Sequence, residues 1–429
     1  MITAMLVIFL ILLFTSVPIA FAIGLSTVVA FYFFSNMPLL YIPQTMFPSV
    51  DSFELLAIPF FILSGAIMKE GGISRRLVDF ISSIVGSYTG GLAIVTVISC
   101  EFFGAISGSA PATTAAIGGI MIPYMVERGY DRGFTAALVA CSGGIGIMIP
   151  PSIPAVIYSV LSGTSVASMF AAGVGPGIVF GLGYIAVSYV HAKKRGFKGE
   201  KRASLREVFV SARKAFWALF MPVLILGGIY SGLFTPTEAA CVSVIYSFII
   251  GFWVYKEIDL SKLKSVLLEA AEFSAMVMIL FAVSATFSTI LTQQNVPKHL
   301  GEWLSAVTTG PVSFLILFTV VMTIIGCFMS PIPAIIILTP LLVPLLPELG
   351  VNPVHFGQLM IVNAAVGSLT PPFGVDMFIA CGITKIPIHV YTRRGLTLIL
   401  ASLALILVVT FVPEISLFLP KLLGMKLGI

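Results

Sequence analysis

Long apolar runs separated by short polar breaks extend along almost the whole chain. Five runs come first, near 2–22, 24–47, 50–69, 131–162 and 165–190. Five more follow, near 214–234, 236–255, 265–293, 352–383 and 395–418. Each is about as long as the roughly 20 residues that a helix needs to cross a bilayer. The pattern therefore predicts an all-helical protein that crosses the membrane many times.

Two further apolar segments are interrupted at their middles by small residues and proline. They lie near 89–126 and 311–346. Proline and glycine at the centre prevent one continuous helix across each segment. We expect each to form a re-entrant hairpin, which enters and leaves the membrane on the same side.

The chain matches itself at an offset of about 221 residues. The matched features are Pro123 and Pro344, Pro150-Pro151 and Pro371-Pro372, and the hairpin entrances Thr89-Gly90 and Gly310-Pro311. Five crossings, an odd number, precede the second copy, so that copy starts from the opposite face. The sequence therefore predicts two inverted-topology repeats, each with a re-entrant hairpin and a discontinuous helix, as in many secondary transporters.

The two predicted repeats contain the same series of elements. The first, 1–190, has scaffold helices at 1–69, an arm at 72–86, the hairpin at 89–126, a broken helix at 131–162 and a helix at 165–190. The second, 215–429, has scaffold helices at 215–293, an arm at 295–306, the hairpin at 311–346, a broken helix at 352–383 and a helix at 395–418. Charged and aromatic residues mix in both arms, which predicts amphipathic helices at the membrane interface.

The positions of the lysines and arginines predict how the chain is oriented in the membrane. With the N-terminus outside and each run crossing once, only Lys298, Lys421 and Lys426 of the 23 lysines and arginines fall outside. Nine of the others, Lys198 among them, lie in a polar linker at 191–214. Because basic residues favour the cytoplasmic side, this linker is expected to be cytoplasmic.

The amino-acid composition indicates that lipid surrounds most of the protein surface. Charged residues make up 10% of the chain and hydrophobic residues 58%, whereas an ordinary soluble domain has about 25% charged residues. The five cysteines lie singly, which predicts no metal or redox centre. No HExxH, GxSxG or GxxxxGK[ST] pattern occurs, which disfavours an enzyme or an ATP-driven pump.

Four chain breaks at membrane depth are the candidate functional site. They lie at Gly104–Thr114, Ser142–Ser152, Gly326–Pro333 and Asn363–Pro372. Broken helices expose carbonyls and amides, which survive only where protein or a cavity satisfies them. Carbonyl and hydroxyl oxygens suit Na⁺, and helix N-termini favour an anionic substrate. Kinking or tight packing alone is the competing interpretation, but it does not account for four symmetry-related breaks.

Two carboxylates lie close to these breaks, where burial makes a charge costly. Asp376 follows the Pro371-Pro372 break by four residues and is expected to face the site. Glu101 lies in the first arm of the first hairpin, and both a proton-sensitive role and a structural role remain open for it.

Four motifs in order resemble the large, DctM-type membrane subunit of tripartite ATP-independent periplasmic (TRAP) transporters. They lie at Phe102–Ser109, Gly146–Pro154, Gly232–Ala240 and Thr370–Gly374. The resemblance covers essentially the whole chain. It implies the ion transporter superfamily fold and an elevator mechanism, in which the hairpins and broken helices slide against a scaffold.

The same resemblance implies how such a subunit works. It implies Na⁺-coupled import, no organic cofactor, a small four-helix (DctQ-type) membrane subunit and a periplasmic solute-binding protein. It also implies a bacterial inner-membrane location, with a periplasmic N-terminus. By motif, the residues expected at Na⁺ are Ser107, Ser109, Gly144, Gly146, Ser330, Gly367 and Thr370. Those expected near the substrate are Thr113, Thr114, Ser152, Phe373 and Asp376.

Two departures from the family pattern affect the choice of substrate. Ala110-Pro111 stands where many relatives have serine and an aliphatic residue, and Asp376 where many have asparagine. Overall likeness favours the sialic-acid branch, and hence N-acetylneuraminate. A C4-dicarboxylate or another organic acid is the alternative. A stand-alone cation/proton antiporter, with Asp376 or Glu101 as proton carrier and no binding protein, is the alternative from another class.

Overall fold

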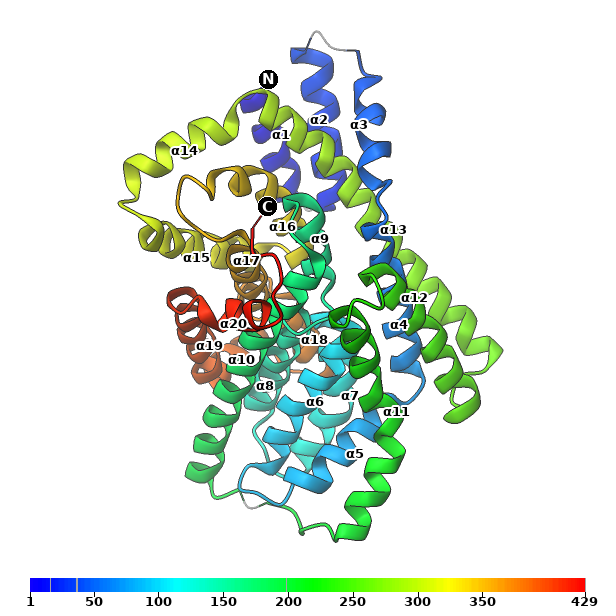
Figure 1. The fold of residues 1–429 in the computed structure, drawn as a ribbon. Helices are drawn as coiled ribbons and strands as arrows, with labels where there is room; N and C mark the ends of the chain where they lie inside the picture. Colours follow the sequence, from blue (N-terminus) through cyan, green and yellow to red (C-terminus); the bar gives the residue numbers. More distant parts are fainter. Residues whose placement is uncertain (16, 36–37, 198, 429) are drawn as a thin grey trace.

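The computed structural model describes residues 1–15, 17–35, 38–197 and 199–428, and it is helical throughout, with no β-strand in those ranges (Figure 1). Lys198 of the predicted linker lies outside the described residues. The all-α class predicted from the apolar runs is confirmed.

Four helices precede the first arm. They are α1 (Ile2–Phe14), α2 (Ile19–Phe34), α3 (Tyr41–Val50) and α4 (Ala57–Glu70). The bounds predicted for the runs 2–22 and 24–47 are wrong, because Pro18 and Pro38 each precede a new helix and cannot continue the one before. The segment 54–70, which contains α4, bends by 68° relative to α3.

A series of six α-helices occurs twice in the same order, once before and once after residues 205–293. The first series is α5 (Ile73–Val85), α6 (Gly91–Ser107), α7 (Ala110–Glu127), α8 (Arg132–Gly144), α9 (Ile153–Ser162) and α10 (Val166–Arg195). The second is α14 (Val296–Val307), α15 (Pro311–Phe328), α16 (Pro331–Leu342), α17 (Pro353–Ser368), α18 (Val375–Thr384) and α19 (Ile388–Phe411). The arm α5 lies near the bottom of Figure 1 and the arm α14 near the top, as inverted repeats require.

The remaining helices are α11 (Leu205–Tyr230), α12 (Pro236–Ile249), α13 (Leu260–Gln293) and α20 (Glu414–Leu422). The last predicted helix, 395–418, is displaced, because α19 starts after Pro387 and ends before Pro413. The motif that begins at Gly232 forms the start of α12, where Thr235 and Glu238 make a reciprocal capping box.

The linker is shorter than predicted, since only 196–204 separates α10 from α11. Lysine and arginine are good helix formers and are favourable at a helix C-terminus, so α10 continues to Arg195. Gly196 ends it with a φ of +72°, and Ser204 caps α11 together with Glu207. Polar character alone did not mark the helix ends.

Six helices are long and apolar enough to cross a membrane among the described residues, or seven if the bent pair of α3 and α4 is one span. They are α10, α11, α12 with its continuation to Val254, α13, α15 and α19. The chain is therefore a multi-pass membrane protein in which the shorter helices of hairpins and broken spans pack between long ones.

Candidate functional site

In each repeat, the hairpin meets the broken helix at a pair of glycines. A Cβ on Gly104 of α6 would lie 2.5 Å from the Cα of Gly146. A Cβ on Gly367 of α17 would lie 2.4 Å from the Cα of Gly326 in α15. Only glycine allows such backbone approach, so both crossings place a hairpin tip directly against a chain break.

The tip of the first hairpin, between α6 and α7, gathers hydroxyl and carbonyl oxygens. Gly108 turns the chain with a φ of +60°, and Ser109 caps α7 by accepting a hydrogen bond from the amide of Ala112 at 3.4 Å. Ser107 Oγ lies 3.0 Å from Thr113 Oγ1, which donates to the carbonyl of Ser109 at 2.8 Å. Three predicted residues, Ser107, Ser109 and Thr113, therefore form one polar cluster.

The break of the first repeat is packed against that tip. Helix α8 ends at Gly144, a 3₁₀ turn covers Ile145–Ile147, and the Pro150-Pro151 peptide is cis. Ser152 donates to the carbonyl of Ile147 at 2.5 Å and accepts from the amide of Ala155 at 3.3 Å, which caps α9.

Two contacts tie this break to its surroundings. A Cβ on Gly146 would lie 2.5 Å from Thr113 Oγ1, so Gly146 belongs to the tip cluster. A Cβ on Gly144 would lie 3.6 Å from the carbonyl oxygen of Ala365, in α17 of the other repeat. The first break thus contacts its own hairpin tip on one side and the second repeat on the other.

The second tip and its break follow the same backbone plan with fewer polar contacts. The amide of Phe373 donates to the carbonyl of Cys327 at 3.1 Å, and the Pro371-Pro372 peptide is cis. Thr370 Oγ1 donates to the carbonyl of Val366 at 2.6 Å. Ser330 stands at the N-terminus of α16, but its side chain makes no capping hydrogen bond.

A cavity of about 250 Å³ opens beside the first tip, and we call it the tip-one cavity. One wall comes from the hairpin and α9, with Ser107, Ser109 and Ile153. The other wall comes from α4 and α13, with Lys69 and Glu269. It therefore lies between the helices predicted to move and those predicted to form the scaffold.

A larger cavity of about 600 Å³, the tip-two cavity, lies between α1 and the second hairpin. The side chains that line it are all apolar and include those of Phe14, Phe328 and Phe373. The rings of Phe328 and Phe373 are 5.9 Å apart, and the side chain of Phe373 is exposed. Phe373, which was predicted near the substrate, thus lies at an apolar cavity in this structure, and substrate contact at Phe373 stays a prediction.

Asp376 lies in the protein interior, fully buried at the start of α18. Its carboxylate accepts hydrogen bonds from Ser368 Oγ at 2.5 Å and from Thr114 Oγ1 at 3.3 Å. This contact joins α7 of one repeat to α17 and α18 of the other. In this conformation both carboxylate oxygens are engaged by the protein, so substrate contact at Asp376 and Thr114 stays a prediction.

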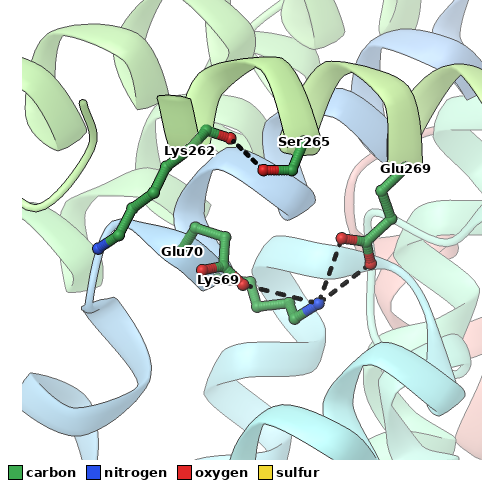
Figure 2. A network of polar contacts seen from close by, with 5 residues as sticks. All are labelled: Lys69, Glu70, Lys262, Ser265 and Glu269. Carbon is green, nitrogen blue, oxygen red and sulfur yellow. Dashed lines mark hydrogen bonds and ion pairs between the residues drawn. The ribbon is translucent and has the colours of Figure 1, made fainter. Parts of the chain in front are cut away.

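The residue pattern did not single out the charged wall of the tip-one cavity. Lys69 Nζ lies 3.0 Å and 3.4 Å from the two carboxylate oxygens of Glu269, and 3.8 Å from Glu70 (Figure 2). The two partners are 200 positions apart. A lysine at one helix end and a glutamate in another apolar run were visible in the sequence, but their pairing depends on how α4 packs on α13.

The arrangement can hold a cation among hydroxyl and carbonyl oxygens and an anion near Lys69 and the starts of α7 and α9. Its elements are two broken helices and two hairpins. The family model for the DctM component of the tripartite ATP-independent periplasmic transporters matches residues 6–415. The chain belongs to this family. It is therefore a transporter subunit and not a catalytic enzyme.

Several curated TRAP proteins are similar over most of the chain. The isethionate TRAP transporter permease protein DctMQ of Oleidesulfovibrio alaskensis is 44% identical over 411 residues, which cover 96% of this chain and 65% of that protein. The C4-dicarboxylate TRAP large permease DctM of Pseudomonas aeruginosa is 42% identical, over 94% of this chain and 95% of that one. The sialic acid TRAP large permease SiaM of Vibrio cholerae is 35% identical, over 96% of each.

A solved structure supports the fold of this TRAP subunit. The YdaH transporter of Alcanivorax borkumensis superposes with a TM-score of 0.66, at 15% sequence identity, over 96% of this chain and 98% of that one. The identity is too low for any comparison of substrates. The resemblance inferred from four motifs is confirmed at the level of family and fold, and the sialic-acid branch is one of several similar groups.

Proposed function

We propose that this chain is the transport subunit for Na⁺-coupled import of an organic anion. The observation that carries the proposal is the polar cluster of Ser107, Ser109 and Thr113, which lies against a chain break and opens to the tip-one cavity. Hydroxyl and carbonyl oxygens without a fixed carboxylate are the ligands expected for Na⁺ at broken helices.

Two Na⁺-binding regions follow from the two crossings. The first uses oxygens at Ser107 and Ser109 together with the chain near Gly144 and Gly146. The second uses Ser330, Thr370 and the chain near Gly367. The Ser330 side chain, which makes no capping hydrogen bond, leaves its hydroxyl available for an ion.

The substrate would enter the tip-one cavity as an anion. Helices α7 and α9 both begin at this cavity, so their amide ends favour negative charge there. Thr113 lies in the first turn of α7 and Ser152 is the N-cap of α9, so both would stand next to an anion bound at these helix starts. The volume of about 250 Å³ is just below the ~300–1,000 Å³ of typical small-molecule pockets, which suits a compact acid.

We rank the candidate substrates by the sequence identity of the relatives that are named for them. Small carboxylates and sulfonates come first, because the relatives named for isethionate and C4-dicarboxylates are 44% and 42% identical. N-acetylneuraminate, the substrate expected from the sequence, comes after them, since the relative named for sialic acid is 35% identical.

Movement in this proposal is of the elevator type. The hairpins and broken helices form the moving part, and α4 and α13 belong to the scaffold that faces the first tip. A Cβ on Gly65 of α4 would lie 3.1 Å from the Cα of Ser107, so the two parts meet closely across a small residue. Sliding along such a surface requires few side chains to repack.

The proposal also includes the assembly. A small four-helix membrane subunit would enlarge the scaffold, and a periplasmic solute-binding protein would deliver the anion. The complex would lie in a bacterial inner membrane with the N-terminus periplasmic and the 196–204 connection cytoplasmic.

Uptake into proteoliposomes tests this function. The chain is reconstituted with its small subunit and supplied with its binding protein and radiolabelled succinate, isethionate or N-acetylneuraminate. We expect uptake of at least one anion that needs both an inward Na⁺ gradient and the binding protein. Uptake that ignored both would overturn the proposal, and uptake driven by a proton gradient alone would favour the antiporter alternative.

A further inference from the structure

The two walls of the tip-one cavity carry different kinds of group. The moving wall offers hydroxyls and helix starts, whereas the scaffold wall offers the Lys69–Glu269 ion pair. Figure 2 shows the Lys69 ammonium pointing to Glu269, while Lys262, on the same helix as Glu269, points away. Lys262 Nζ instead donates to the carbonyl of Glu257 at 2.9 Å.

We propose that Lys69 binds the carboxylate or sulfonate of the transported anion, and that the Glu269 carboxylate competes with the anion for Lys69. This inference rests on the function proposed above. When substrate occupies the cavity, its anionic group replaces the Glu269 carboxylate on Lys69. When substrate leaves, Glu269 returns to the lysine.

The accessibility of the pair favours this exchange. The side chain of Glu269 is 58% exposed and that of Lys69 is 30% exposed. A displaced Glu269 therefore regains water, and an exposed ion pair of this kind is held only weakly. Lys69 keeps an anionic partner throughout, so its partly buried ammonium is never left unpaired.

Because Lys69 lies on the scaffold, it can bind the anion in only one position of the moving hairpin. A cation on the moving wall would travel with the substrate, whereas a cation on α4 meets it only when the first tip lies beside α4. Lys69 would therefore stabilise the substrate in this one position of the hairpin. Glu70, at 3.8 Å, adds a second negative group that favours release of the anion from the lysine.

The test compares Lys69→Met with Glu269→Gln, because both remove the same ion pair. The purified complex with its small subunit is titrated with succinate, isethionate or N-acetylneuraminate in saturating Na⁺, and thermal stabilisation gives the half-saturating concentration. Lys69→Met should raise this concentration about tenfold or more, the effect of losing one charged hydrogen bond. Glu269→Gln should lower it, because the competitor is gone.

Two further variants keep the result interpretable. Lys69→Arg preserves the cation and should bind within about threefold of the wild type. Lys262→Met removes a lysine that does not line the cavity and should bind as the wild type does. If Lys69→Met and Glu269→Gln weaken binding alike, the pair is only a brace between α4 and α13, and the proposal is wrong.

Failure of this inference is separable from failure of the proposed function. Na⁺-driven uptake by the wild type, combined with equal effects of the two substitutions, would retain the function and reject the role of Lys69. A wild type stabilised by none of the three anions would reject anion binding at the cavity. Uptake without Na⁺ coupling would reject the function itself.

Discussion

The two hairpin tips have the same backbone arrangement, but the side chains around them differ. At both tips a glycine of the hairpin meets a glycine of the broken helix, and both breaks carry a cis Pro-Pro peptide. Yet the tip-one cavity contains hydroxyls and an ion pair, whereas the lining of the tip-two cavity is apolar.

The difference comes largely from what each tip faces. Helices α4 and α13 line the cavity at the first tip, whereas α1 lines the cavity at the second, although α13 also packs against α16 of the second hairpin. Duplication thus explains the glycine crossings, which depend on the backbone, but not the cavities, which depend on the side chains of both walls. In the proposed mechanism, the two repeats move together and the first tip binds the anion.

The largest expected effects come from filling the glycine crossings. Gly104→Ala and Gly367→Ala each force a methyl to within 2.5 Å of backbone, and overpacking of this kind costs about 1–3 kcal/mol. Both variants should lose most uptake and melt at lower temperature. Gly119→Ala in α7 is the control, since a Cβ there meets nothing within 4 Å. If Gly104→Ala reduces uptake and Gly367→Ala does not, the two glycine crossings are not equivalent.

The two serines at the tips should differ in stability. Ser109 caps α7, so Ser109→Ala should lower the unfolding free energy by about 1 kcal/mol. Ser330 makes no such bond, so Ser330→Ala should cost well under about 0.5 kcal/mol. Thermal denaturation of the purified complex without added Na⁺ compares them. Equal losses would mean that the second tip is capped as well.

The apolar cavity should matter for packing and not for the coupling ion. Phe328→Ala removes the ring pair with Phe373, worth about 0.5–1.5 kcal/mol. The melting temperature should fall slightly, while the Na⁺ concentration for half-maximal uptake stays unchanged. Val320→Ala, on the same helix and outside the cavity lining, is the control. A shifted Na⁺ dependence in Phe328→Ala alone would give the apolar cavity a role in coupling.

The smallest effect is expected at the arms. Arg76 of α5 pairs with Glu257 at 2.7 Å and lies over the ring of Tyr255, whereas no ion pair involves α14 among the described residues. Arg76→Met should cost about 1 kcal/mol or less, since the pair is partly exposed. Arg75→Met, at an exposed neighbour, should cost nothing measurable in the same melting experiment. A large loss of uptake in Arg76→Met would show that the first arm has a greater mechanical role.

The sequence predicted the order of elements well because that order rests on long-range periodicity and on glycine and proline. Pro150-Pro151 and Pro371-Pro372 mark both breaks in the sequence itself. Helix ends were less predictable. The linker looked polar throughout, but lysines and arginines extend α10 to Arg195.

The site was predictable where one motif supplies several neighbours, as with Ser107, Ser109 and Thr113. It was not predictable where distant helices meet. The Lys69–Glu269 pair and the Asp376 contacts with Thr114 and Ser368 are set by helix packing across the repeats. The direction of the Phe373 side chain also depends on packing, and in the structure this side chain lines an apolar cavity.

The central claim, that Na⁺ binds at both hairpin tips, is tested most directly by ion-dependent stabilisation. The melting temperature of the purified complex is measured against Na⁺ concentration, with K⁺ at equal ionic strength as reference, for the wild type, Ser107→Ala and Thr370→Ala. A ligand that binds only the folded state raises its stability, so Na⁺ should raise the melting temperature and K⁺ should not. Each substitution should reduce that rise. A rise that both variants retain in full, or one that K⁺ reproduces, would contradict the account.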